Sequence, residues 1–102
     1  MITHVVLLRL RKTVPKAEID RVFDRLAALK QRIPGLITFS GGAYSSPEGL
    51  HQGYTHGFVM TFADAAARDA YLPHPEHEKV KKLVLDVLDG GLDGVVAFDF
   101  ES

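Results

Sequence analysis

Apolar residues recur along this chain with two different spacings, and each spacing predicts a type of element. Residues 2–11 are mostly β-branched or apolar over a length too short for a lone helix, which favours a strand. From Pro15 onward the apolar residues return every three or four positions, a spacing typical of a helix with one buried face. We expect this helix to stop before Pro34-Gly35. Its apolar stripe consists of Ile19, Val22, Phe23, Leu26, Leu29 and Ile33.

The middle of the chain predicts two more strands, over 36–44 and 54–62, joined by a polar loop over 45–53. Gly41 and Gly42 weaken the first of these strands and indicate a bulge or a close backbone approach. In the second strand, side chains alternate between two faces, and one face carries bulky residues. These residues are Tyr54, His56, Phe58, Met60 and Phe62.

The last third of the chain predicts a helix broken in two, followed by a strand. Asp64 is a favourable N-cap for a short alanine-rich helix that ends near Leu72. Pro73 and Pro75 break it, and Pro75 suits the first turn of a second helix. That helix stops at residues 89–91, Asp-Gly-Gly, and a strand follows over 95–100. Its apolar stripe consists of Val80, Leu83, Val84, Val87 and Leu88.

The predicted order of elements is β-α-β-β-α-β within a single domain of residues 1–102. Helices mixed with antiparallel strands indicate an α+β fold, with a four-stranded antiparallel sheet and both helices on one face. We assign one set of apolar strand residues to the helix-covered face and the remainder to the opposite face. The covered set is Val6, Leu8, Leu10, Phe58, Met60, Phe62, Phe98 and Phe100, and the opposite set is Val5, Leu7, Val59, Val95 and Ala97.

The second face predicts self-association. Two helices cover only one side of a four-stranded sheet, so the other side would expose an apolar patch of roughly several hundred Å². At ~25 cal/mol per Å², covering such a patch is worth several kcal/mol. A second copy of the chain is the simplest cover, because twofold dimers are the commonest closed oligomers. We therefore expect a homodimer formed through the sheet faces.

Composition narrows the functional classes. The chain has 12 basic and 13 acidic residues and a net charge of −1, which argues against a nucleic-acid partner. No apolar run approaches the roughly 20 residues that span a bilayer, so no membrane association is expected. The absence of cysteine excludes disulfides, thiolate metal sites and cysteine nucleophiles, and it fits a cytoplasmic location. The unusual feature is a set of five histidines: His4, His51, His56, His74 and His77.

Five short segments stand out along the chain: His4-Val5-Val6-Leu7-Leu8, Ile33-Pro34-Gly35, Ser46-Pro47-Glu48-Gly49-Leu50, Gly53-Tyr54-Thr55-His56 and Tyr71-Leu72-Pro73-His74-Pro75-Glu76-His77. In this order and with matching gaps, they resemble the stress-responsive dimeric α/β-barrel family, called Dabb, over roughly residues 2–100. The resemblance implies a ferredoxin-like α+β fold whose two sheets close into a barrel across a dimer. The chain departs from the family at Tyr44, where an asparagine is common.

The resemblance also implies alternatives for function. Most members have no known chemistry, which fits a homodimeric stress-responsive protein with a small apolar ligand pocket. One branch, the plant polyketide cyclases, closes a linear polyketide without a cofactor, using residues that match Tyr71 and His77. Histidines matching His4 and His56 lie near that pocket. The alternative function is therefore a cofactor-free lyase or cyclase acting on a polyketide-like or aromatic carbonyl compound. A monooxygenase is a weaker analogy that rests on fold alone.

In the catalytic alternative His77 is the general base, because an imidazole titrates near neutral pH, and Tyr71 is the hydrogen-bond donor to the enolate oxygen. The alternative without chemistry is that His77 braces the start of its helix while Tyr71 packs at the edge of the core. His74 and His77 have a spacing seen in metal-ligand pairs, but Pro75 lies between them, so we expect no metal and no cofactor.

We expect the candidate pocket to lie between the sheet and the helices, with Tyr71, His77, His4 and His56 converging in it. The ligand-contacting set predicted with them is His4, His56, Phe23, Leu26, Phe58, Leu72 and Val80.

Overall fold

The structure is a computed structural model that describes residues 1–102, and its elements follow the predicted order. The short 3-10 turns are η1, which extends α1, and η2, which precedes β4. The bounds are β1 (Ile2–Leu8), α1 (Lys16–Ala28), η1 (Leu29–Gln31), β2 (Leu36–Ala43), β3 (His56–Phe62), α2 (Ala65–Tyr71), α3 (Pro75–Val87), η2 (Gly91–Gly94) and β4 (Val95–Glu101).

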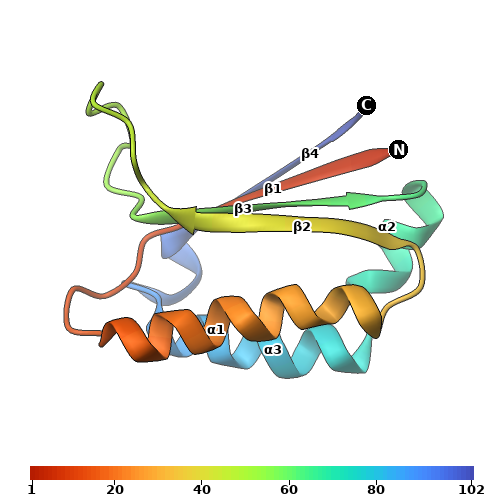
Figure 1. Cartoon of the computed structure of the whole chain (residues 1–102), viewed down its shortest axis with the longest axis horizontal. Helices are drawn as coiled ribbons and strands as arrows, with labels where there is room; N and C mark the ends of the chain where they lie inside the picture. Colours follow the sequence, from red (N-terminus) through yellow and green to blue (C-terminus); the bar gives the residue numbers. More distant parts are fainter.

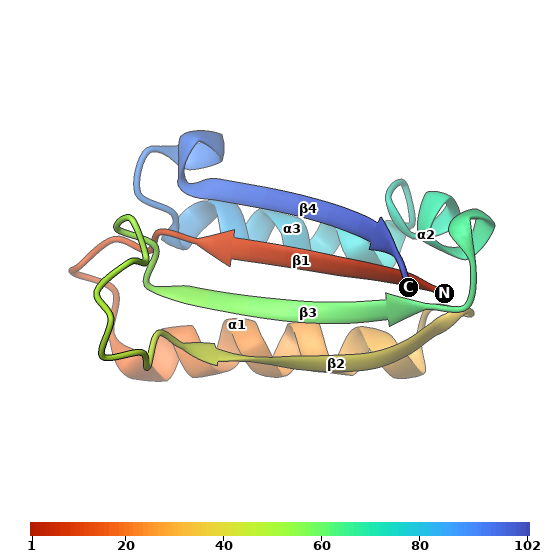
Figure 2. The same cartoon turned by 90° about the horizontal axis from the view of Figure 1, so that it is seen from above.

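The four strands form one antiparallel sheet in the order β2-β3-β1-β4 (Figure 2). Helices α1 and α3 lie side by side on one face of this sheet, and the other face carries no helix (Figure 1). The ferredoxin-like fold predicted from the sequence is therefore confirmed. No helix in the structure combines the length and apolar character needed to cross a membrane.

The core lies between the sheet and the helices, where the apolar stripes of α1 and α3 meet the strands. Val22 and Leu26 of α1 and Val80 and Val87 of α3 are buried there. Asp64 caps α2 as expected, with its carboxylate accepting from the backbone N–H of Ala67 at 2.8 Å. Local sequence signals thus account for where the helices begin and which side they bury.

The predicted face of β4 was wrong. Val6 of β1 pairs with Ala97, and Val5 pairs with Phe98, so Ala97 points toward the helices while Phe98 points away. By the same alternation Val95 lies on the helix side and Phe100 on the uncovered side. Both faces of β4 carry apolar residues, so only the register of β4 with β1 decides which of the two faces is buried.

The uncovered side, here called the open face, carries two contrasting sets of residues. The set called the ridge consists of the exposed phenylalanines of β4: Phe98 is 64% exposed and Phe100 is 46% exposed. The set called the trough consists of the small residues that β2 turns to this side, Thr38, Ser40 and Gly42. The loop from Tyr44 to Thr55 rises on the same side of the sheet, away from the helices (Figure 1).

Two adjacent glycines of β2 have different roles. A Cβ on Gly41 would lie 2.7 Å from Cβ of Phe58 and 2.9 Å from the ring of Phe23, so only glycine fits there. A Cβ on Gly42 would meet nothing within 4 Å. The close approach predicted for this glycine pair therefore holds at Gly41, which lies on the helix side.

Candidate functional site

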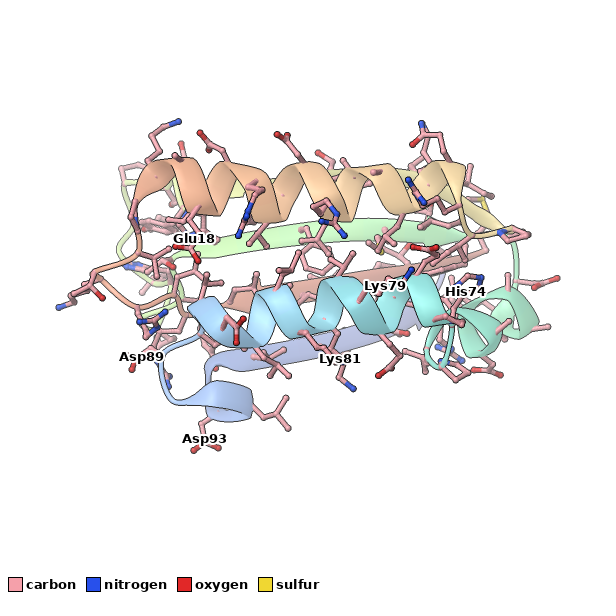
Figure 3. All side chains as sticks on the ribbon, turned by 90° about the horizontal axis from the view of Figure 1, so that it is seen from below. Glu18, His74, Lys79, Lys81, Asp89 and Asp93 are labelled. Atoms are coloured by element: carbon pink, nitrogen blue, oxygen red, sulfur yellow. The ribbon has the colours of Figure 1, made fainter.

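A cavity of about 260 Å³ lies between α3 and the strands β1 and β4. Most of its lining is apolar, and its polar side chains are His4, Tyr71, His77 and Lys81. Helix α3 turns its Lys79 side toward α1 and its Lys81 side toward β4, which puts Lys81 on the cavity side (Figure 3). The remaining lining residues are Val6, Leu8, Leu26, Phe58, Leu72, Val84, Leu85, Leu88, Leu92, Val95 and Ala97.

The break between α2 and α3 brings two of these polar side chains together. Tyr71 ends α2, and its ring stacks on the imidazole of His77, with centroids 4.1 Å apart and an interplanar angle of 29°. His74 caps α3, its Nδ1 accepting from the backbone N–H of Glu76 at 3.1 Å. His74 therefore belongs to the turn and not to the cavity.

His77 braces the helix break and still keeps one nitrogen free. Its Nδ1 lies 2.9 Å from the carbonyl oxygen of Leu72. A carbonyl only accepts, so Nδ1 carries the proton and Nε2 keeps its lone pair. Burial lowers the pKa of His77, although the Leu72 hydrogen bond opposes this. The imidazole is therefore neutral at pH 7, which is the form that a general base needs.

Tyr71 is the buried partner, only 1% exposed. Burial, helped by the negative charge of Asp99, raises the pKa of its hydroxyl well above the ordinary value of 10. The hydroxyl therefore keeps its proton and can donate a hydrogen bond. The hydroxyl has no hydrogen-bond partner within the chain. Every side-chain N or O atom that is inaccessible to solvent does have a hydrogen-bond partner, so the hydroxyl is not one of these inaccessible atoms. It follows that the hydroxyl reaches the open volume of the cavity.

His4 enters the cavity from β1, on the face turned toward the helices, and is 7% exposed. Its ring lies among aromatic neighbours, with centroids 6.0 Å from Tyr71 and 6.2 Å from Phe58. Its Nδ1 lies 2.5 Å from Oδ1 of Asp99 on β4. The polar side chains of His4, Tyr71 and His77, from β1, α2 and α3, therefore lie together in a mostly apolar cavity whose fourth polar side chain is Lys81.

The cavity brings together six of the residues predicted for it, namely His4, Leu26, Phe58, Tyr71, Leu72 and His77. Of the four polar side chains expected to converge, the structure places Tyr71, His77 and His4 in this cavity and His56 outside it. His56 pairs with Leu8, four residues beyond His4 on β1, and contacts Phe23 with ring centroids 5.7 Å apart. His56 and Phe23 are not among the residues that line the cavity, because His56 lies on β3 beside α1, whereas the cavity lies between α3, β1 and β4.

Val80 also lies outside the cavity. It is buried and borders a separate hollow together with Arg25 of α1, because the rotation of α3 aims it toward α1. The residues of α3 that do face the cavity follow His77 at helical spacing, and this spacing was the signal available in the sequence. They are Lys81, Val84 and Leu85, and Leu88 directly follows the helix.

A second hollow, of about 480 Å³, lies beneath the loop from Tyr44 to Thr55, and His56 borders it. The Tyr44 ring stacks on His51 with centroids 3.8 Å apart, and its hydroxyl accepts from the backbone N–H of Gly49 at 2.8 Å. Tyr44, the departure from the family pattern, thus organises this loop. No group of three or more histidines and carboxylates has a geometry that could hold a metal ion.

Comparisons with known proteins agree with this fold. The sequence model of the family described as Stress responsive A/B Barrel Domain matches residues 2–102. A stress-response A/B barrel domain-containing protein of Arabidopsis thaliana, HS1, is 33% identical over 100 residues, covering 98% of this chain and 88% of the relative. A crystal structure of a dimeric ferredoxin-like protein of unknown function from Jannaschia sp. CCS1 is 31% identical, with a TM-score of 0.84, covering 99% of this chain and 98% of that one.

Two solved enzymes share the fold at lower identity. A hydroxynitrile lyase from Passiflora edulis is 19% identical with a TM-score of 0.86, covering 97% of this chain and 90% of that one. SnoaB, a cofactor-independent oxygenase from Streptomyces nogalater, is 17% identical with a TM-score of 0.76, covering 99% of this chain and 91% of that one. At these identities the likeness concerns the fold alone.

Proposed function

The chain belongs to the stress-responsive A/B barrel domain family, and from this membership we propose that it is a small homodimeric protein that binds an apolar carbonyl ligand in the cavity under α3. One observation carries the proposal: the polar side chains of His4, Tyr71 and His77 meet in a cavity whose lining is mostly apolar. Ligand pockets typically combine an apolar lining with a few polar groups that orient the ligand.

The size of the cavity restricts the ligand. Its volume of about 260 Å³ lies just below the roughly 300–1,000 Å³ typical of ligand pockets. One aromatic ring with a short side chain suits this volume. Leu72 and Leu92 border the cavity and are exposed, so they form an apolar rim. A ligand would bury this rim while its polar atom faces Tyr71 and His77.

The homodimer in this proposal forms through the open face. The relative from Jannaschia sp. is described as dimeric, and the exposed phenylalanines of β4 need a cover. A twofold axis places the same surface on both partners, so the Phe98–Phe100 ridge of one copy can pack against the Ser40–Gly42 trough of the other. The small side chains of the trough allow the sheets to approach to about 10 Å.

A thermal-shift series tests ligand binding, with acetophenone as the probe. A bound ligand stabilises the folded state by about 2.7 kcal/mol at one hundred times its dissociation constant. Ala97→Leu adds bulk at the cavity wall and should reduce the shift, whereas Ala17→Leu adds the same bulk on exposed α1 and should not. An equal shift in both variants would place the probe elsewhere and reject the cavity as its site.

A second candidate function is a cofactor-free lyase or cyclase step on an aromatic or polyketide-like carbonyl compound. The observation that favours it is the neutral His77 with a free Nε2 beside the protonated Tyr71 hydroxyl. Nε2 would take a proton from the carbon next to the carbonyl. The C–H electron pair would move toward the carbonyl oxygen, and Tyr71 would donate a hydrogen bond to the charge that develops there.

Deuterium exchange tests this chemistry directly. Acetophenone in D₂O exchanges its methyl protons when a base forms the enolate, and NMR follows the loss of the proton signal. His77→Ala should lower the protein-catalysed rate by about 10²–10⁴-fold. His51→Ala, a histidine outside the cavity, is the matched control and should leave the rate unchanged. A wild-type rate equal to that of buffer would reject the enzymatic function.

A further inference from the structure

A chain of ionic hydrogen bonds links three elements behind the cavity. The Arg68 guanidinium of α2 donates to Oδ2 of Asp99 at 2.9 Å, and the other carboxylate oxygen of Asp99 faces Nδ1 of His4. Apart from Tyr71, His4 is the one residue of the buried core whose side chain is polar. Burying a polar group costs folding free energy unless it is hydrogen-bonded. Packing alone therefore does not explain why these three polar groups lie here.

The ionisation of Asp99 decides which nitrogen of His4 carries a proton. Burial alone would raise the pKa of Asp99, but the hydrogen bonds from His4 and Arg68 outweigh it and hold this pKa below its ordinary value. Asp99 is therefore a carboxylate at neutral pH and can only accept. Nδ1 of His4 must then donate, which leaves Nε2 as the nitrogen without a proton in the neutral ring.

Nε2 of His4 is open to the cavity. It has no hydrogen-bond partner in the chain. Since every solvent-inaccessible side-chain N or O atom has such a partner, this nitrogen must be accessible. His4 lines the same cavity as His77, and the two imidazoles have the same arrangement, with Nδ1 bonded to the protein and Nε2 free. They differ in their partners, since His4 faces a carboxylate and His77 a neutral carbonyl.

We propose that His4 is a second acid–base residue of the cavity, positioned by Asp99 and Arg68 to serve the carbonyl oxygen of the ligand. This inference rests on the proposed enolisation, and it adds the group that gives a proton to the carbonyl oxygen. The imidazole next to the carboxylate can hold a positive charge because Asp99 balances it, as in hydrolase triads. His4 thus supplies the acid and His77 supplies the base.

The proton balance is as follows. Nε2 of His77 removes a proton from the α-carbon, and the C–H pair becomes the carbon–carbon double bond of an enol. The carbonyl π pair moves to oxygen and takes the proton from Nε2 of protonated His4. His77 ends protonated and His4 ends neutral, so the total charge is unchanged. The enol hydroxyl can then donate back to Nε2 of His4, and the reverse steps restore the ketone.

Arg68 determines which atom of residue 99 faces His4 when that residue is changed to asparagine. A guanidinium only donates, so the Asp99 atom that faces Arg68 must be an acceptor. In Asp99→Asn the amide oxygen would therefore turn to Arg68, and the amide NH₂ would turn to Nδ1 of His4. The single proton of neutral His4 would then lie on Nε2, and Nδ1 would face an amide NH₂ instead of a carboxylate. The doubly protonated ring that donates in the proposed step would therefore lose its counter-charge.

NMR of the full chain labelled with ¹⁵N-histidine tests the positioning. We expect neutral wild-type His4 to carry its proton on Nδ1, and the Asp99→Asn variant to carry it on Nε2. Arg68→Met alone should keep the wild-type tautomer, because Asp99 is still a carboxylate that only accepts. Added to Asp99→Asn, Arg68→Met should leave a mixture of tautomers, whereas Arg68→Lys should keep the proton on Nε2, because a lysine also only donates. Asp69→Asn removes the other carboxylate partner of Arg68 and should change nothing. An Nε2–H tautomer in the wild type, or an unchanged tautomer in Asp99→Asn, would overturn the proposal.

Acetophenone exchange separates the failure of this inference from that of the proposed function. Both hold if His4→Asn and Asp99→Asn each lower the exchange rate by about 10²-fold or more. If His77→Ala abolishes exchange while His4→Asn and Asp99→Asn exchange like the wild type, the acid role of His4 is wrong and the base role of His77 stands. If the wild type itself shows no exchange, both are rejected.

Discussion

Tyr71 and His77 stack with ring centroids 4.1 Å apart across the break between α2 and α3. The break brings the two rings into contact, and it also leaves a backbone carbonyl that His77 can bond. His74 takes the backbone N–H of Glu76, so the Leu72 carbonyl at the end of α2 is free to accept from His77. One imidazole therefore supports the turn through Nδ1 and offers Nε2 to the cavity.

The two contributions of His77 to stability can be separated. His77→Phe keeps an aromatic ring against Tyr71 but loses the hydrogen bond to Leu72, which should cost about 0.5–1.5 kcal/mol. His77→Ala also loses the stack and should cost about another 0.5–1.5 kcal/mol. Urea denaturation of both variants measures the difference. Equal stability of the two variants would show that the stacked rings contribute nothing.

Stability should fall as the pH drops below the ordinary histidine pKa of 6.5. Burial lowers the pKa of both His77 and His56 in the folded state. Above pH 6.5 both groups are neutral, folded or unfolded. Below it the unfolded chain takes up these protons first, so acid favours unfolding.

Urea denaturation midpoints between about pH 7.5 and about pH 5 measure how steeply the stability changes with pH, which is the slope meant below. This pH range lies above the titration of the carboxylates. His77→Phe should flatten the slope, because one of the two responsible groups is gone. His51→Phe, in the exposed loop, should leave the slope as it is. A slope that is the same in wild type and His77→Phe would contradict the role assigned to His77.

The homodimer should depend on the ridge of the open face. Phe98→Asp places a charge where an apolar ring would be buried against the partner, and we expect monomers at micromolar concentration. Lys30→Asp, a charge change on the exposed helix side, should leave the dimer intact. Light scattering and sedimentation give the mass. A dimeric Phe98→Asp variant would show that this face is not the interface, and a monomeric wild type would reject the dimer.

The two glycines of β2 form a matched pair. Gly41→Ala forces a methyl group against Phe58 and Phe23 and should destabilise the fold by about 1–3 kcal/mol. Gly42→Ala meets open space and should be neutral, or stabilising by up to about 1 kcal/mol. Denaturant unfolding measures both. A Gly41→Ala variant as stable as Gly42→Ala would mean that the approach to Phe58 is looser than it is here.

Some features of the site could be predicted from local signals. Pro73, the His74 cap and Pro75 end one helix and start another, and this alone places Tyr71 near His77. The alternation of β1 and β3 assigns His4 and Phe58 to the helix side. The pairing of His4 with Asp99 could not be predicted, because it needs the register of β4, and Arg68 joins them only through the position of α2.

The sequence by itself determined the order of elements, the helix boundaries and the family, because capping, proline breaks and apolar spacing act over a few residues. The tertiary structure decided the rest. Phe98 and Ala97 took faces opposite to those expected, since β4 is apolar on both sides and only pairing with β1 sets its parity. Val80 and His56 lie outside the cavity because the rotation of α3 aims Val80 toward α1 and the position of β3 in the sheet puts His56 beside Phe23, and no local pattern encodes either arrangement.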